Sequence, residues 1–86
     1  MKISIVTVTY NSEKTIRDTL NSIMSQTYKN IEHIIIDGGS KDQTKSILKR
    51  YPNNKKKLYT KSNSGIYEAI NHGIKKATGD YITILN

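Results

Sequence analysis

Two short polar segments follow the most apolar stretches of the sequence and have the chemistry to bind a ligand. Thr9-Tyr10-Asn11 comes directly after Ile3 to Val8, and Asp37-Gly38-Gly39-Ser40 comes directly after Ile31 to Ile36. A carboxylate such as Asp37 can accept a hydrogen bond from a base N–H or a sugar hydroxyl, and the two glycines allow a ligand close to the backbone. The alternative is that Asp37 only caps its own turn.

The neighbouring residues also have more than one role open to them. The Tyr10 ring can stack on a flat ligand or pack against the protein, and Asn11 suits a helix N-cap first and a ligand contact second. Ser40 has no visible base, so we do not expect a serine nucleophile. His33 and His72 have no partner at metal-ligand spacing, and we expect both to be structural, with His72 on the exposed side of a helix.

Missing motifs exclude several other functions. The sequence has no G-x-G-x-x-G and no G-x-x-x-x-G-K-[ST], which disfavours a dinucleotide-dependent dehydrogenase and a P-loop NTPase. It has no cysteine, and therefore no thiolate nucleophile or cysteine-bound zinc. With no apolar run of 18 residues and no signal-peptide pattern, we expect a cytoplasmic protein without a membrane-spanning helix.

Alternating apolar patterns predict the elements that position these residues. Strands are expected at residues 3–9 and 31–36, at the more polar 57–61, and at 81–85. Helices are expected between them, the second capped by Asp42 and the third beginning at Asn63-Ser64-Gly65. The order β-α-β-α-β-α-β predicts an α/β fold with a three-layer parallel sheet. The inward residues would be Ile16, Leu20, Ile23 and Met24, then Thr44, Ile47, Leu48 and Tyr51, then Ile66, Ala69, Ile70, Gly73, Ile74 and Ala77.

The net charge of +7 is concentrated in one part of the 86-residue chain. The window Lys41–Lys61 holds eight basic residues and one acid, and the remainder is balanced. This window is either a solvated helix face with a Lys-rich turn or a surface that meets anions. It contains only Tyr51 and Tyr59 as stacking aromatics, so we do not expect a nucleic-acid partner.

Taken together, these segments resemble the opening of family 2 glycosyltransferases of the GT-A fold. The resemblance is carried by Ile5–Asn11, Leu20–Ile23 with Gln26-Thr27-Tyr28, Glu32–Thr44, Asn63–Ile74 and Ala77–Ile82. It implies a Rossmann-like sheet with strand order 3-2-1-4, the N-terminal half of a GT-A domain. Residues 1–86 would then be a partial nucleotide-diphospho-sugar-binding domain that ends before the metal-binding acidic motif.

The resemblance also implies a function and a set of site residues. The function would be inverting transfer of a sugar from a nucleotide-diphosphate sugar, usually UDP-linked, to an acceptor hydroxyl in surface glycan synthesis. Asp37 would accept from the uracil imide N–H. The nucleotide pocket would be lined by Thr9, Tyr10 and Asn11, its floor shaped by Gly38, Gly39, Ser40 and Asp42, and its donor side by Ser64, Gly65 and Asn71.

The chain departs from the family pattern in two ways. Ile70 stands where many relatives have Arg, so no arginine contact to the nucleotide is expected. The acidic motif that holds Mg²⁺ or Mn²⁺ is expected after Asn86, so neither metal ligands nor catalytic residues are expected in this chain. The alternative to an enzyme fragment is a non-catalytic nucleotide-binding or self-associating module of the same fold.

Three partners are expected besides the donor. They are a glycan or lipid-linked acceptor, the inner face of the membrane through Lys41–Lys61, and a second copy through the uncharged strand edge Tyr81–Leu85.

Overall fold

The computed structural model describes residues 1–52, 55–62 and 65–85. The elements alternate as predicted, and the third strand begins one residue before its predicted start. Asn63 and Ser64, where the third helix was predicted to begin, lie outside the described residues. The elements are β1 (Ile3–Thr9), α1 (Ile16–Met24), β2 (Ile31–Asp37), α2 (Thr44–Arg50), β3 (Lys56–Thr60), α3 (Ile66–Lys76) and β4 (Tyr81–Ile84).

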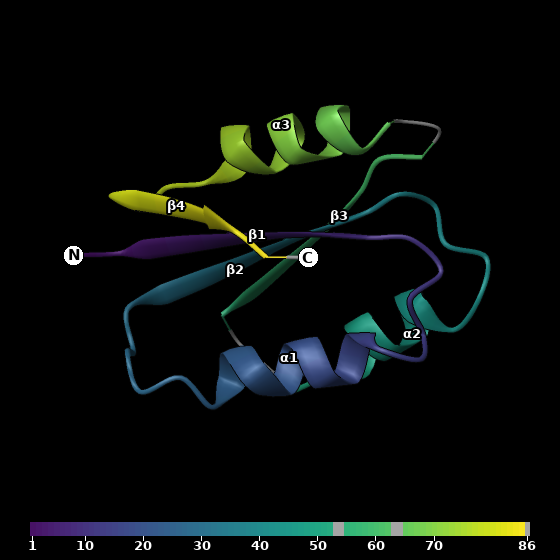
Figure 1. The fold of residues 1–86 in the computed structure, drawn as a ribbon, viewed down its shortest axis with the longest axis horizontal. Coiled ribbons are helices and arrows are strands. Elements are labelled where there is room, and N and C mark those ends of the chain that lie inside the picture. The colour runs from purple at the N-terminus through teal and green to yellow at the C-terminus, as the bar shows by residue number, and fades with distance from the viewer. Residues whose placement is uncertain (53–54, 63–64, 86) are drawn as a thin grey trace.

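The four strands form one parallel sheet in the order β3-β2-β1-β4, which confirms the expected order. Figure 1 shows α3 on one face of the sheet and α1 with α2 on the other, so the fold has three layers. In the register, Thr9 of β1 lies beside Asp37 of β2, and Asp37 lies beside Thr60 of β3. The carboxyl ends of these three strands therefore meet at one edge of the sheet.

Each face of the sheet has its own hydrophobic core. Ile34, Ile35 and Ile36 of the central strand β2 are fully buried, because helices cover both faces there. Ile35 belongs to the cluster under α1 and α2, and Ile34 and Ile36 belong to the cluster under α3. The first cluster is Ile16, Leu20, Ile35, Ile47 and Leu48, and the second is Val6, Ile34, Ile36 and Ala69.

Three residues predicted to face inward are exposed. Ile66 is 52% exposed, Ile74 38% and Met24, the last residue of α1, 49%. Ile66 and Ile74 are exposed because α3 approaches the sheet closely at Gly73, where an added Cβ would lie 2.5 Å from the Cγ1 atom of Val6. The helix packs through its small residues, and its larger side chains remain at the flanks.

The first helix begins later in the chain than the expected N-cap role of Asn11 would place it. The carbonyl of Ser12 accepts hydrogen bonds from the amides of Thr15 and Ile16, which forms a turn before α1 begins at Ile16. Asn11 is not an N-cap, since its backbone has a φ of 48° and its side chain accepts from the Lys41 amide. The N-cap residue of α2 is Gln43 and not Asp42, but Asp42 Oδ1 accepts from the amide of Thr44, the first residue of α2, at 2.9 Å.

At the opposite end of the sheet, where the strands begin, the buried Glu32 joins four parts of the chain. Its carboxylate accepts from Ser4 Oγ at 2.5 Å and from the Thr78 amide at 2.6 Å, and it pairs with Lys57 Nζ at 3.0 Å. Burial alone would raise the pKa of Glu32, but these hydrogen bonds outweigh burial and hold the pKa well below its usual 4.5. This cluster thus ties β1, β2 and β3 to the loop before β4.

Candidate functional site

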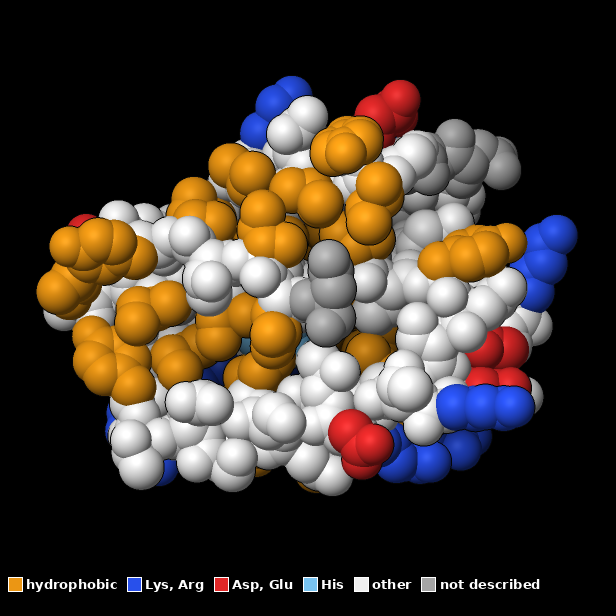
Figure 2. Space-filling view, in the orientation of Figure 1, with side chains coloured by type: hydrophobic (Ala, Val, Ile, Leu, Met, Phe, Trp, Pro, Cys, Tyr) orange, Lys and Arg blue, Asp and Glu red, His pale blue; other side chains and the backbone are white. Residues whose placement is uncertain are grey.

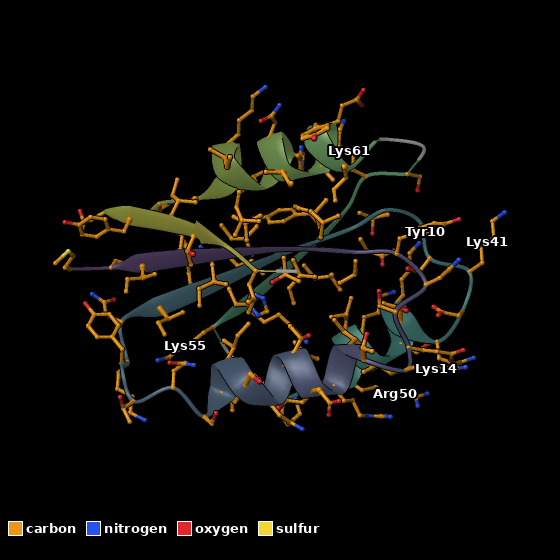
Figure 3. All side chains as sticks on the ribbon, viewed as in Figure 1. Tyr10, Lys14, Lys41, Arg50, Lys55 and Lys61 are labelled. Atoms are coloured by element: carbon orange, nitrogen blue, oxygen red, sulfur yellow. The ribbon has the colours of Figure 1, made fainter. Side chains whose placement is uncertain are left out.

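A pocket of about 740 Å³ lies at the carboxyl ends of β1 and β2. This is the edge of an open parallel sheet where ligands bind. Figure 3 shows Tyr10 and Lys41 together at this end of the molecule, on the loops that follow the two strands. The pocket is lined by Val8, Thr9, Tyr10, Ser12, Gly38, Gly39, Lys41, Ser62, Gly65, Ile66 and Ala69.

Five of the predicted site residues lie in this lining: Thr9, Tyr10, Gly38, Gly39 and Gly65. Tyr10 is 56% exposed, so its ring is not part of the core. A Cβ added at Gly38 would lie 3.5 Å from the Tyr10 ring. The absence of side chains at positions 38 and 39 therefore leaves the pocket open beside an exposed aromatic face.

Asp37 lies behind the pocket and is fully buried. Its Oδ1 atom accepts from Thr9 Oγ1 at 2.8 Å and from Ser40 Oγ at 2.6 Å. Its Oδ2 atom accepts from the amides of Gly39 at 3.1 Å and Ser40 at 2.8 Å. This is the turn-capping arrangement, and it occupies all of about four positions at which a carboxylate accepts hydrogen bonds.

Asn11, Ser40 and Asp42 support the pocket by joining its two loops. The Asn11 amide donates to Ser40 Oγ at 2.9 Å, and the Lys41 amide donates to Asn11 Oδ1 at 2.8 Å. The Glu13 amide donates to Asp42 Oδ2 at 3.2 Å. These cross-links hold the loop after β1 against the loop after β2.

Asn71 neither lines the pocket nor joins its loops. It is exposed on α3. Ser64 lies outside the described residues.

Ser62 and Lys41 line the pocket although neither was predicted as a site residue. Ser62 stands two residues after β3, and an added Cβ at Gly39 would lie 3.0 Å from its Oγ atom. Because ligands bind at the carboxyl ends of parallel strands, the position of Ser62 just after β3 is the signal in the sequence that could have indicated it.

The two histidines differ from each other in their surroundings. His33 is fully buried, with Nε2 2.8 Å from Thr7 Oγ1, and burial together with the charge of Lys56 lowers its pKa to about 4. His72 is half-buried on α3 with its ring edge against Tyr59, 6.0 Å between centroids, so the expectation that it faces solvent was wrong. Neither histidine lines the 740 Å³ pocket.

A second hollow of about 600 Å³ lies at the opposite edge of the sheet, between the end of α1 and the start of β2. Ile23, Tyr28, Ile31 and His33 are among its lining residues. It lies at the amino ends of the strands, away from the edge where open parallel sheets bind ligands.

Within residues 1–52, 55–62 and 65–85, no three His, Cys, Asp or Glu side chains gather as metal ligands would. In the same parts of the chain, no helix has the length and apolar character needed to cross a membrane.

A parallel α/β sheet of this strand order, with helices on both faces, defines a Rossmann-like domain, a class in which ligands bind at the carboxyl ends of the strands. The chain belongs to glycosyl transferase family 2, which it matches over residues 4–86. This confirms the resemblance found in the sequence.

Relatives and solved structures agree with this assignment. The chain is 39% identical over 84 residues to an uncharacterized glycosyltransferase of Rickettsia typhi, covering 98% of this chain and 26% of that protein. It superimposes on S. aureus TarS 1-349 in complex with UDP-GlcNAc with a TM-score of 0.85 and 33% identity, over 99% of this chain and 26% of that one.

A mannosyltransferase from Pyrobaculum calidifontis, PcManGT, in complex with GDP-Man and Mn²⁺, gives a TM-score of 0.88 at 26% identity. The match covers 96% of this chain and 27% of that one. The chain thus spans about a quarter of the length of these proteins.

Proposed function

We propose that the pocket at the carboxyl ends of β1 and β2 binds the nucleotide of a UDP-linked sugar. The observation that carries this proposal is the exposed Tyr10 ring beside Gly38, at the end of the sheet where parallel folds bind ligands. A base stacked on the ring would lie near Gly38, which has no side chain to obstruct it. Stacking on an aromatic ring tolerates any base, so the choice of uracil must come from polar groups nearby.

The chain would act as the donor-binding part of an inverting glycosyltransferase in surface glycan synthesis. The acceptor would be a hydroxyl of a glycan or a lipid-linked sugar. A pyrophosphate leaving group needs a divalent cation to offset its charge, so the complete enzyme would use Mg²⁺ or Mn²⁺ held by residues outside this chain. Complexes of relatives with UDP-GlcNAc and with GDP-Man and Mn²⁺ support this proposal.

Contact with the inner face of the membrane would be made by α2 and its flanks. Lys41, Lys49 and Arg50 are exposed there, whereas Lys57 pairs with Glu32 and Lys56 donates to the carbonyl of Tyr51 at 3.0 Å. Figure 3 places Lys41 and Arg50 near one end and Lys55 farther along the molecule. Part of the Lys41–Lys61 window is therefore used inside the fold, and the proposed contact is limited to the exposed part.

The proposed donor is tested by isothermal titration of the chain with UDP, GDP and ADP, each with and without Mn²⁺. We expect UDP to bind more tightly than GDP or ADP, and Mn²⁺ to add little, because we place the acidic residues that would hold the metal outside this chain. Tighter binding of GDP than of UDP would contradict the UDP assignment. A large gain with Mn²⁺ would contradict the proposal that the metal ligands lie outside this chain.

A further inference from the structure

We infer that Asp37 and Ser40 are positioning residues, which hold the Tyr10 ring in place for the ligand and do not touch the ligand themselves. This inference rests on the proposed function, because it assigns these two residues their part in binding the base. It differs from the expectation that Asp37 accepts directly from the uracil imide N–H.

The first observation is that the Asp37 carboxylate has no accepting position left. Each oxygen already accepts two hydrogen bonds, from Thr9 and Ser40 on one side and from the amides of Gly39 and Ser40 on the other. The side chain is fully buried, and Asp37 is not among the residues that line the pocket. A base could reach it only after one of these bonds had broken.

The second observation is that both chain neighbours of Tyr10 are fastened to this carboxylate. Thr9 donates to Asp37 Oδ1 directly at 2.8 Å. The Asn11 amide donates to Ser40 Oγ at 2.9 Å, and the same hydroxyl donates to Asp37 Oδ1 at 2.6 Å. The backbone on each side of Tyr10 is therefore connected to one buried group.

The third observation is the backbone of Asn11, which has a φ of 48°. This left-handed conformation is unfavourable for most residues, and asparagine tolerates it better than most. The bond from the Asn11 amide to Ser40 and the bond from the Lys41 amide to Asn11 Oδ1 hold it in place. The sharp change of direction after Tyr10 leaves its ring on the surface of the pocket, beside Gly38.

The variant Ser40→Ala separates the two roles of Asp37. It removes the link to Asn11, leaves the Asp37 carboxylate in place and frees one of its accepting positions. If Asp37 contacted the base directly, uridine binding would be unchanged or tighter. Because we infer a positioning role, we expect Ser40→Ala to weaken uridine and UDP by the same factor, about tenfold, as expected when base stacking is lost.

The position of the ring is measured without any ligand by placing tryptophan at position 10. The chain has no tryptophan, so Tyr10→Trp gives a single fluorescent reporter. We expect Ser40→Ala to increase the mobility of this indole in time-resolved anisotropy. The matched control is Ser25→Ala. Ser25 is an exposed serine just after α1, its hydroxyl donates to the Ser22 carbonyl, and it does not line the pocket.

A second variant keeps the test decisive if Ser40→Ala does not fold. Thr9→Val removes the other link, the bond from Thr9 Oγ1 to Asp37 Oδ1, while Asp37 and Ser40 remain unchanged. We expect weaker uridine binding and a more mobile indole for this variant also. Wild-type uridine affinity together with an unchanged indole in the folded variants would overturn the inference.

If the wild-type chain binds neither uridine nor UDP, the proposed function fails, and the mobility of the indole still decides whether Asp37 and Ser40 hold residue 10 in position.

Discussion

At the scale of single residues, the most informative contrast is between Asp37 and His33, two buried polar groups on the same strand. Each carboxylate oxygen of Asp37 accepts two hydrogen bonds, whereas His33 has Thr7 as the partner of one ring nitrogen and none on Nδ1 in the described structure. A group whose hydrogen bonds are complete can hold a turn rigidly. Burial of His33 penalises the charged imidazole, so the stability of the fold depends on its protonation state.

His33 predicts a pH-dependent stability. Its pKa is lowered from 6.5 to about 4 by burial and by the charge of Lys56, so the unfolded chain binds a proton that the folded chain does not. Stability should therefore fall as the pH drops from 6.5 towards 4, by about 3 kcal/mol in total at about 1.4 kcal/mol for each pKa unit.

Urea unfolding at pH 7 and pH 5 measures this loss. His33→Asn should have a flatter pH profile over this range. An equal slope in the wild type and in His33→Asn would show that another group causes the acid sensitivity.

At the scale of elements, the Glu32 cluster is the connection between the strands and the loop before β4. Glu32→Gln replaces one accepting oxygen by an amide group that donates, facing Lys57 or Thr78. We expect a loss of about 1–3 kcal/mol in the free energy of unfolding, which is the cost of leaving buried polar groups unpaired. The exposed Glu68→Gln on α3 is the control, with little expected change.

The Glu32 cluster also has a pH dependence of its own. The pKa of Glu32 is lowered in the folded state, so its contribution is present above about pH 4.5 and is lost as the pH falls below that value. The loss of stability between pH 6.5 and 4.5 should therefore come from His33 and not from Glu32. If the free energy of unfolding of Glu32→Gln at pH 7 equals that of the wild type, the cluster does not have the stabilising role given to it here.

The elements were predictable from the sequence because their residues repeat with a clear period. The run Ile34-Ile35-Ile36 is typical of a strand covered on both faces, and it proved to be the centre of the sheet. The exposed positions of Ile66 and Ile74 were not predictable, because they result from the close packing of Gly73 on Val6, which only the assembled fold contains.

The candidate pocket was predictable in place and less so in detail. The polar segments that follow the two most apolar stretches contain Thr9, Tyr10, Gly38 and Gly39, which line the pocket, and ligands bind at the carboxyl ends of parallel strands. The rule cannot say which way a side chain turns at the strand end. Asp37 turns inward to its own loop, and Asn11 bonds to Lys41 across the gap between two loops.

At the scale of the whole molecule, one face remains apolar and exposed. All four residues of β4 are exposed, with Tyr81 at 61%, Ile82 at 44% and Ile84 at 45%. Figure 2 shows hydrophobic side chains gathered over β4 and α3 on this face. An unpaired edge strand without charge is a template for pairing with another chain, so we propose that the chain self-associates through β4.

Light scattering over a range of concentrations tests this proposal. We expect a dimer or larger species at high micromolar concentration, and a shift towards monomer for Ile84→Lys, because a charge at the edge opposes pairing. A single monomeric species with a cooperative melt at high concentration would show that β4 needs no partner.

The central claim is that the pocket beside Tyr10 binds a uracil nucleotide, and calorimetric titration with UDP tests it most directly. The chain should bind UDP weakly. Tyr10→Ala should lose about 1–3 kcal/mol of binding free energy because the base no longer stacks on the ring. Asp37→Ala should lose a similar amount, because the turn that positions Tyr10 loses its hydrogen-bond acceptor. UDP binding of equal strength in the wild type and in Tyr10→Ala, or no binding to the wild type, would contradict this claim.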